Sequence, residues 1–215
     1  MLELFSLDNA LSKSPILRFV NSMKIDYEKW HDGIGYDIEA IEEANTRERE
    51  AIESILLDKT PRDWRDIEAL AILNTPRARS TILRALLDDN NEVNMAVLRF
   101  APELISNQLK TRVLVKALKS ASFFDGFSQT LNIVMEYHPK EVVEELFHGL
   151  INREGKIAVH FAAMLFYIYG KAETIFDEEH RDFFLKFNTP ILSERKLVFK
   201  EFCKKIDVDY KNFIV

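Results

Sequence analysis

The sequence predicts an all-α protein in which antiparallel helix pairs are stacked on one another, and three observations support this. Glycine and proline together number 12 in 215 residues, where average usage gives about 26, so a turn-rich sandwich or barrel is disfavoured. No segment shows the sustained alternation of apolar and polar residues that is typical of a half-buried strand. Apolar residues instead recur with helical spacing, as in Ile67, Leu70, Ala71 and Leu73.

Length and composition predict one folded domain. Apolar residues make up 47% and charged residues 30% of the chain, which favours a sizeable core under a solvated surface and excludes a disordered chain. The single cysteine, Cys203, cannot form an internal disulfide, so a reducing compartment is expected. The N-terminus carries Glu3 and Asp8 where a secretory signal would carry Lys or Arg. The most apolar run, 157–169, is shorter than the roughly 20 residues of a membrane span, and it predicts a buried helix.

The prolines mark the expected element boundaries. In Thr60-Pro61, Thr75-Pro76 and Thr189-Pro190, the threonine can cap a helix and the proline lacks an N–H that would need a partner, so each pair predicts a helix start. His138-Pro139 predicts a further boundary. Taken in order, the expected helices cover 7–20, 37–57 (in one piece or two), 62–73, 76–87, 91–103, 107–119, 123–137, 139–150, 155–169, 178–187 and 190–203.

A repeat of about 32 residues is the most informative pattern in the chain. The segment Ile82–Leu86 aligns with Leu114–Leu118 and then with Leu146–Leu150, each time at an offset of 32. Every block has two bulky apolar residues, one basic or imidazole residue, one small residue and a leucine. The small residue is expected to let neighbouring helices approach closely. An ordinary helical bundle is the alternative, but two equal spacings favour a repeat.

Two motifs carry a resemblance to a known family. Residues 86–93, Leu-Leu-Asp-Asp-Asn-Asn-Glu-Val, are similar to a helix end, a short acidic turn and the next helix start. Asp63-Trp64-Arg65, followed by Glu68-Ala69-Leu70, is similar to the opening of a first repeat helix. With these motifs the chain resembles the HEAT-like helical repeat family of the short bacterial type.

This resemblance implies an architecture for the whole chain, residues 1–215. The expected fold is a right-handed α-α superhelix, a HEAT/ARM-like solenoid of stacked antiparallel helix pairs. The repeats are expected over 60–170, with 1–59 as the N-terminal cap and 171–215 as the C-terminal cap. The number of repeats stays open.

Equivalent positions in the three blocks predict a binding row. Arg84, Lys116 and His148 hold the same place in successive blocks, and equivalent positions of a solenoid line one face. A row of donors suits an acidic partner surface or a phosphate-bearing ligand. The alternative is that these are ordinary exposed positions at which polar residues are expected.

The charge distribution favours a protein partner over a nucleic acid. Residues 77–119 contain eight Lys or Arg and four Asp or Glu, a net charge of +4, whereas residues 1–57 have a net charge of −6. The whole chain is at −6, unlike the basic balance of most nucleic-acid binders. The expected basic patch comprises Arg77, Arg79, Arg84, Lys110, Arg112, Lys116 and Lys119.

The segment from Trp30 to Asp37 is a second candidate site. His31 and Asp32 are adjacent and could bind a metal or act as an acid-base pair if further ligands converged on them. A recognition loop using Trp30 and Tyr36 is an alternative, and a glycine-hinged loop whose two rings close the first repeat is another. No His-Glu-x-x-His spacing is present.

The other residues with a conceivable functional role have structural explanations. Gly170 is expected to end a helix, and the acids after it to lie in the first turn of the next one. The phenylalanines at 183, 184 and 187 are expected to form the last core layer. His160 lies on an almost wholly apolar segment and is expected to be a core histidine. Cys203 has no catalytic histidine at a recognisable spacing.

These observations lead to one predicted function and one alternative. The predicted function is a non-enzymatic, cytoplasmic protein-binding module of scaffold, chaperone-like or toxin-immunity type, without cofactor or membrane contact. The alternative is a nucleic-acid-binding or DNA-repair protein of the helical-repeat glycosylase type, which would need a cationic groove, an acidic catalytic residue and base-stacking aromatics. Metal binding by His31 and Asp32 is a weaker alternative. The residues assigned to partner binding are Arg84, Lys116, His148, Arg77, Arg112, Lys119, Trp64, Trp30 and Tyr36.

Overall fold

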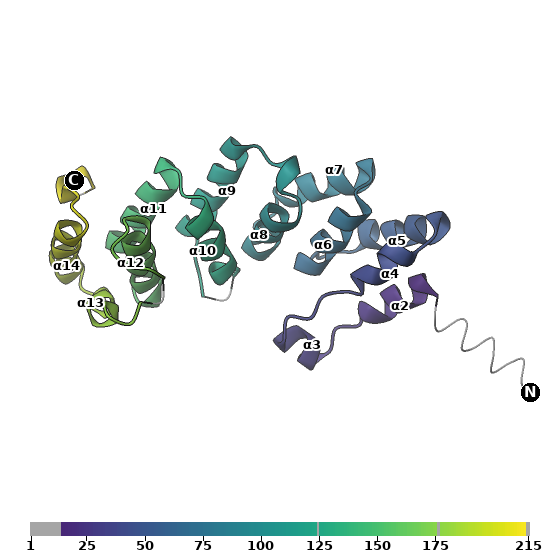
Figure 1. The fold of residues 1–215 in the computed structure, drawn as a ribbon, viewed down its shortest axis with the longest axis horizontal. Helices are drawn as coiled ribbons and strands as arrows, with labels where there is room; N and C mark the ends of the chain where they lie inside the picture. Colours follow the sequence, from purple (N-terminus) through teal and green to yellow (C-terminus); the bar gives the residue numbers. More distant parts are fainter. Residues whose placement is uncertain (1–13, 124, 176, 214–215) are drawn as a thin grey trace, which may run out of the picture. The chain divides into compact units, whose positions relative to one another are not determined.

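Helices and their connecting loops make up the structure, a computed structural model that describes residues 14–123, 125–175 and 177–213 (Figure 1). No strand occurs within these ranges. The all-α class predicted from the sequence is therefore confirmed.

By its internal contacts the chain divides into two compact units, Met1–Ile105 and Ser106–Val215. The boundary falls inside the expected repeat region of 60–170. The single domain over 1–215 stays a prediction.

In the first unit, α6 is the central helix. It packs against α4, α5, α7 and α8, while α2 packs against α4 and α5. The helices are α2 (Pro15–Ser22), α3 (Tyr27–His31), α4 (Ile38–Glu43), α5 (Thr46–Asp58), α6 (Trp64–Leu73), α7 (Pro76–Ala85) and α8 (Asn91–Phe100), and the 3-10 helix η1 (Pro102–Leu104) follows them.

Capping residues explain where several of these helices begin. The helix expected over 37–57 is in two pieces because the Asn45 side chain accepts a hydrogen bond from the Glu48 amide, while the Glu48 carboxylate accepts one from the Asn45 amide. Such a reciprocal box satisfies two amides that a new helix leaves free. The Thr75-Pro76 start is confirmed, since Thr75 Oγ1 accepts from the Ala78 amide and Pro76 is the first helical residue.

Three expectations for this unit need correction. A helix start at Thr60-Pro61 is wrong, because Asp63 caps α6 and the helix begins at Trp64. The helix expected over 91–103 ends at Phe100. Pro102 disfavours the α conformation at Ala101, the residue before it, and so ends the helix there. The short α3 was not expected at all. Of the helix expected over 7–20, residues 7–13 lie outside the described part of the chain, and α2 begins at Pro15.

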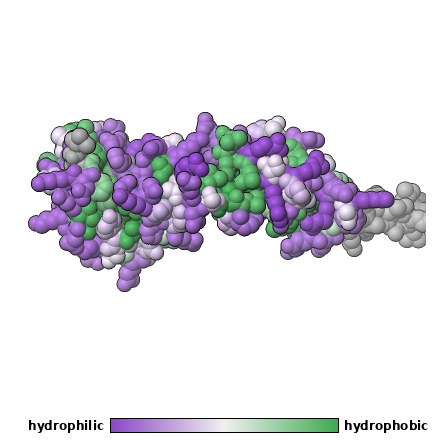
Figure 2. Space-filling view, turned by 90° about the horizontal axis from the view of Figure 1, so that it is seen from above, coloured by the Kyte–Doolittle hydropathy of each residue, from purple (hydrophilic) through white to green (hydrophobic). Residues whose placement is uncertain are grey.

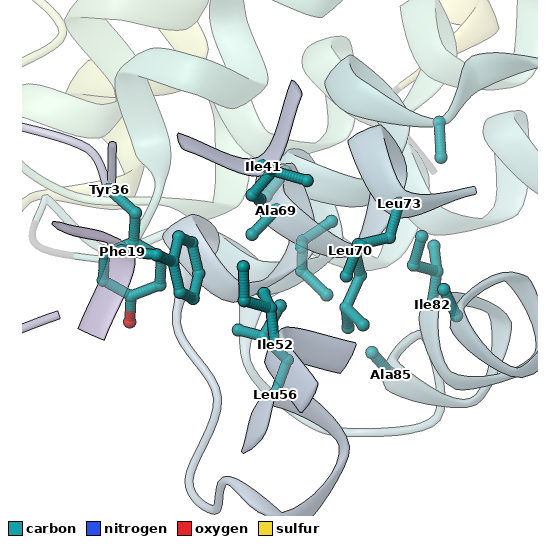
Figure 3. Packing of buried hydrophobic residues seen from close by; sticks show 14 of the residues in the cluster. Phe19, Tyr36, Ile41, Ile52, Leu56, Ala69, Leu70, Leu73, Ile82 and Ala85 are labelled. Carbon is teal, nitrogen blue, oxygen red and sulfur yellow. The ribbon is translucent and has the colours of Figure 1, made fainter. Parts of the chain in front are cut away.

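The core of the first unit is built from α2, α4, α5, α6, α7 and α8, and Figure 3 shows part of it. Phe19 of α2 is fully buried and meets the Tyr36 ring edge-on, with centroids 5.6 Å apart. Figure 3 shows the Tyr36 hydroxyl turned away from the apolar cluster. Ile52, Leu70 and other aliphatic side chains fill the remainder. Burying each such side chain stabilises the fold by about 1.5–3 kcal/mol.

Helices α9 to α14 make up the second unit. Helix α11 contacts α9, α12 and α14, while α10 contacts α9 and α12, and α12 also contacts α13. The helices are α9 (Asn107–Lys119), α10 (Phe127–Glu136), α11 (Lys140–Asn152), α12 (Lys156–Ile168), α13 (Arg181–Leu185) and α14 (Leu192–Lys205), followed by the 3-10 helix η2 (Tyr210–Asn212).

Most boundaries in this unit agree with the sequence. Pro139 separates α10 from α11, as its position predicts. Gly170 ends α12 with a positive φ of 66°, and the Lys171 amide bonds to the Phe166 carbonyl at 2.9 Å, a bond typical of glycine-terminated helices. The expected core layer is confirmed for Phe184 and Phe187, which are 3% and 0% exposed.

Three helices of the second unit begin later than expected. The helix expected from 123 starts at Phe127, after Gly126, which has a positive φ of 64°. The helix expected from 178 starts at Arg181. The helix expected from Thr189-Pro190 starts at Leu192. In the latter case Thr189 Oγ1 accepts from the Ile191 amide and donates to Glu194, so the threonine shapes a turn in front of the helix instead of capping it.

The small residue of each repeat block is buried, as predicted. Ala85 is 4% and Ala117 is 2% exposed. At Gly149 of α11 the ring of Phe161 from α12 lies so close that a Cβ would overlap it. The glycine therefore permits the contact between these two helices.

We expect Gly149→Ala to lower the free energy of unfolding by about 1–2 kcal/mol. Overpacking a core costs about 1–3 kcal/mol, and the higher helix propensity of alanine returns up to about 1 kcal/mol. Urea unfolding followed by circular dichroism measures the change. In a Phe161→Leu background the same substitution should be neutral or stabilising, and an equal loss in both backgrounds would show that the ring contact is not the cause.

Candidate partner-binding surface

Helix α9 presents three of the predicted binding cations on one face. Arg112, Lys116 and Lys119 are exposed and stand at positions i, i+4 and i+7, which share one side of a helix. Ser106 caps the helix by accepting from the Leu109 amide at 3.2 Å. The opposite side of α9 is buried, and Leu114 is its most enclosed residue. The amphipathic pattern of α9 therefore directs the three cations outward.

Helix α11 packs beside α9 and carries the next predicted residue, His148, which is exposed. One turn before it, Glu145 lies 3.8 Å from Lys119 Nζ. The Glu145 side chain is 15% exposed and the Lys119 side chain 64%. Arg153, which follows α11, donates to the carbonyls of Lys119 (2.9 Å) and Ala121 at the end of α9. These contacts hold the two helices in register.

Between the row of cations and the α10–α11 junction lies an open groove of about 910 Å³ with a mostly apolar lining. Val115, Tyr137 and Pro139 supply its apolar surface. The Tyr137 hydroxyl donates to the Asn107 carbonyl at 3.1 Å and lies 2.9 Å from Thr111 Oγ1. The Tyr137 ring is therefore fixed in place before any partner arrives.

A smaller recess of about 350 Å³ adjoins this groove, and Lys119 lines both. Lys116 from the groove and His148 from the recess thus belong to one continuous surface of the second unit. We call it the α9–α11 surface. Its residues are Asn107, Gln108, Thr111, Arg112, Val115, Lys116, Lys119, Ser120, Tyr137, Pro139, Glu141, Glu145, His148, Gly149, Asn152 and Arg153.

Of the remaining cations of the predicted patch, Lys110 is on α9, and Arg77, Arg79 and Arg84 lie in the first unit. Arg77 and Arg84 of α7 line a separate groove of about 380 Å³ that also includes Leu57 of α5. Arg84 donates to Thr81 Oγ1 at 3.2 Å, and Arg77 lies 3.8 Å from Glu53. Because the units are described separately, the step from Arg84 to Lys116 stays a prediction.

The loop that contains α3 exposes large aromatic side chains. Trp30 is 65% exposed and packs near Tyr27, with ring centroids 6.1 Å apart. The buried Arg65 of α6 anchors this loop. Its Nε donates to the Ile34 carbonyl at 2.7 Å and its Nη2 to the Lys29 carbonyl at 3.4 Å. The arrangement presents Trp30 to solvent on an anchored loop.

Tyr36, the second aromatic assigned to partner binding, is 6% exposed. Its hydroxyl donates to Asp66 at 2.9 Å, and Lys59 Nζ lies 2.8 Å from the same carboxylate. Burial, together with the Asp66 charge, raises the pKa of the Tyr36 phenol. In this position the ring joins α6 to the start of α4 and offers little surface to a partner.

The candidate catalytic and metal-binding residues form no complete site in the described part of the chain. His31 Nδ1 lies 2.9 Å from Asp32 Oδ1, with both side chains more than half exposed. Within the described residues, no group of three or more His, Cys, Asp or Glu is placed to hold a metal. Burial raises the pKa of the Cys203 thiol to about 12, which disfavours the nucleophilic thiolate. His160 is half-buried against Phe123 and Phe127, and this burial lowers its pKa.

Trp64, which the nucleic-acid alternative requires, is half-buried on α6. Its ring is nearly parallel to that of Phe100, with centroids 6.4 Å apart, and the Arg65 guanidinium lies 4.6 Å from it. Glu68 follows one turn later. Burial raises the pKa of Glu68, and the charges of Arg99 and Arg65 oppose that shift.

The face shown in Figure 2 is mostly hydrophilic, and hydrophobic side chains reach it in separate patches. None of the helices in the described ranges is long and apolar enough to span a lipid bilayer. The apolar run 157–169 forms α12, in which Phe161, Met164 and Leu165 are fully buried, as expected for a core helix.

Three residues of the α9–α11 surface, Tyr137, Glu145 and Arg153, are not among the binding residues predicted from the sequence. Tyr137 had a weak signal as an aromatic residue just ahead of the proline boundary. Glu145 and Arg153 had none, because their partners lie 26 to 34 positions earlier in the chain. Such pairs are visible only once the packing of α9 against α11 is known.

Comparison with protein-family models, with curated proteins and with solved structures gave no match to this chain.

Proposed function

We propose that this protein is a non-enzymatic protein-binding module of the HEAT-like type, built as a solenoid of stacked antiparallel helix pairs. The contacts inside the second unit support this architecture, because α9, α11 and α14 follow one another in one row while α10, α12 and α13 follow one another in a second. Two parallel rows of helices are what a stack of hairpins produces. The 32-residue repeat supports the same architecture.

One observation carries the functional proposal: the α9–α11 surface combines a row of exposed cations with a fixed aromatic ring. Arginine and tyrosine are enriched among the residues that dominate binding energy at protein interfaces. Arg112 and Tyr137 offer these two side chains on adjacent elements. Complementary charge speeds association and selects the partner. Mechanistically, the module acts by holding its partner, with no covalent step.

The cysteine content supports a proposal for the cellular location. A single buried Cys203 suits a reducing compartment, so the proposed location is the cytoplasm. A scaffold, a chaperone-like subunit and a toxin-immunity protein would all use such a surface. Trp30 on its anchored loop supplies a second exposed contact in the first unit.

Charge reversal on α9 tests this function. We expect the double variant Arg112→Glu/Lys116→Glu to bind a partner captured from native lysate at least about tenfold more weakly, a change of about 1.4 kcal/mol in binding free energy. Its unfolding free energy should change by less than about 1 kcal/mol, because both side chains are exposed. The captured complex is quantified by titration with purified components.

A matched control is available on α14. Lys200→Glu/Lys204→Glu introduces the same charge change at the same i, i+4 spacing on exposed positions and should leave binding intact. Equal binding by both double variants would show that the α9–α11 surface is not the binding site. Failure to capture any stoichiometric partner with the wild type would remove the binding function itself.

A nucleic-acid-binding or DNA-repair role of the helical-repeat glycosylase type is the second candidate, and the surroundings of Glu68 favour it. This carboxyl is half-buried, has a raised pKa and lies one turn from Trp64. An acidic residue beside an aromatic ring is the pair of residue types that this alternative requires. The net charge of −6 and the packing of Trp64 against Phe100 favour the protein-binding proposal.

A gel shift on duplex DNA across a salt series separates the two functions. A nucleic-acid binder gives a shift at low salt that weakens steeply as salt rises, because binding releases counterions. The protein-binding proposal predicts no shift even at the lowest salt.

A further inference from the structure

The cations of the α9–α11 surface form a line and do not converge on a point. Arg112 and Lys119 are seven residues apart on one helix, which corresponds to about 10 Å along the axis. A single phosphate group is bound by donors that converge on it, whereas a line of cations matches several carboxylates distributed along a chain. The spacing therefore favours an acidic segment over a small anionic ligand.

The acidic residues of the α9–α11 surface leave its charge mainly positive. Glu145 is 15% exposed and its carboxylate faces Lys119, so little of it is accessible. Glu141 of α11 is exposed and also lines the groove, where it is one carboxylate beside three cations. A basic segment would meet Arg112, Lys116 and Lys119 at close range, and like charges repel it.

The groove beside the cations supplies apolar contact as well. Val115 lies between Arg112 and Lys116 in the sequence of α9, and Tyr137 and Pro139 line the same groove. Lys110 Nζ lies 4.5 Å from the Tyr137 ring centroid, which adds to the positive charge at this end. A purely polar ligand would leave this apolar lining uncovered, whereas an apolar side chain would bury it.

We propose that the α9–α11 surface binds an acidic segment of a partner protein, with an apolar side chain of that segment seated on Val115 and Tyr137. The carboxylates on either side of it pair with Arg112 and Lys116. This inference rests on the proposed function and specifies the chemistry of the partner.

Three labelled synthetic peptides of equal length test the proposal by fluorescence anisotropy with the full-length chain. One alternates Glu and Leu, one Glu and Ser, and one Lys and Leu. We expect the Glu/Leu peptide to bind with a micromolar dissociation constant that weakens with salt, because exposed charges are screened. The Glu/Ser peptide should bind at least about tenfold more weakly, since it loses the apolar contact, and the Lys/Leu peptide should not bind.

Variants locate the binding. Arg112→Glu/Lys116→Glu should weaken the Glu/Leu peptide at least about tenfold, and Lys200→Glu/Lys204→Glu should not. Val115→Ser should weaken the Glu/Leu peptide several-fold and leave the Glu/Ser peptide unchanged. Equal binding of the Glu/Leu and Lys/Leu peptides would overturn the proposal, as would a Glu/Leu affinity that survives charge reversal on α9. Binding of duplex DNA that displaces the Glu/Leu peptide would assign the surface to nucleic acid instead.

Competition against a captured partner separates this inference from the proposed function. An excess of the Glu/Leu peptide should displace the partner from the wild-type protein. If charge reversal on α9 releases the partner but the peptide does not, the binding function stands and the acidic-segment inference fails. If charge reversal releases nothing, the proposed site fails.

Discussion

Replacement of Asp66 by alanine is expected to lower the free energy of unfolding by about 3–5 kcal/mol. The Asp66 side chain is fully buried. It accepts hydrogen bonds from the Tyr36 hydroxyl, from Lys59 Nζ and from the Asp63 amide. Alanine would leave all three donors without this acceptor, and unsatisfied buried donors carry the full cost of desolvation.

Conservative variants separate the parts of this effect. Asp66→Asn keeps the size and an acceptor oxygen but removes the charge facing Lys59, so its loss should be smaller than that of Asp66→Ala. Tyr36→Phe removes one hydroxyl and should lower the free energy of unfolding by about 1–2 kcal/mol. Urea unfolding of the full chain measures all three. A loss below about 1 kcal/mol for Asp66→Ala would contradict the account of the first unit.

Phe147→Ala is expected to lower the free energy of unfolding by about 3–5 kcal/mol, the range for deleting a buried aromatic ring. Phe147 of α11 is fully buried. Its ring centroid lies 5.9 Å from that of Tyr169, 6.1 Å from that of Phe199 and 4.1 Å from that of Phe213. The substitution therefore opens a cavity where α11, α12, α14 and the C-terminal segment meet.

Leu197→Ala on α14 is the matched control, because this side chain is 67% exposed. It should change the free energy of unfolding by less than about 0.5 kcal/mol. The same denaturant titration serves both variants, and an unchanged m-value would show that the unfolded reference state is the same. Similar losses for the two variants would contradict the packing described for the second unit.

The sequence predicted the helices best where local chemistry decides them. Thr75-Pro76 and Pro139 determine boundaries through capping and through the missing amide of proline, and both are effects of adjacent residues. The break before α5 depends on the reciprocal Asn45 and Glu48 bonds, which are also local, whereas the apolar spacing leaves open whether 37–57 forms one helix or two. The five-residue α3 is too short to show helical periodicity.

The candidate surface was predictable in part, for a related reason. The spacing of Arg112, Lys116 and Lys119 on one helix decides that they share a face. Tyr137 joins them only through contacts with Asn107 and Thr111, which depend on how α10 and α9 pack. Tyr36 illustrates the opposite case. The sequence leaves open whether its ring belongs to a recognition loop or closes the first repeat, and the structure buries the ring, with its hydroxyl bonded to the buried Asp66 and close to Lys59.

The most direct test of the proposed binding function is amide hydrogen exchange of the full chain with and without its captured partner. The α9–α11 surface predicts increased protection in 107–119 and 137–152 on complex formation, and unchanged exchange in α14. Protection confined to other segments, with these two unchanged, would contradict the assignment of this surface as the binding site.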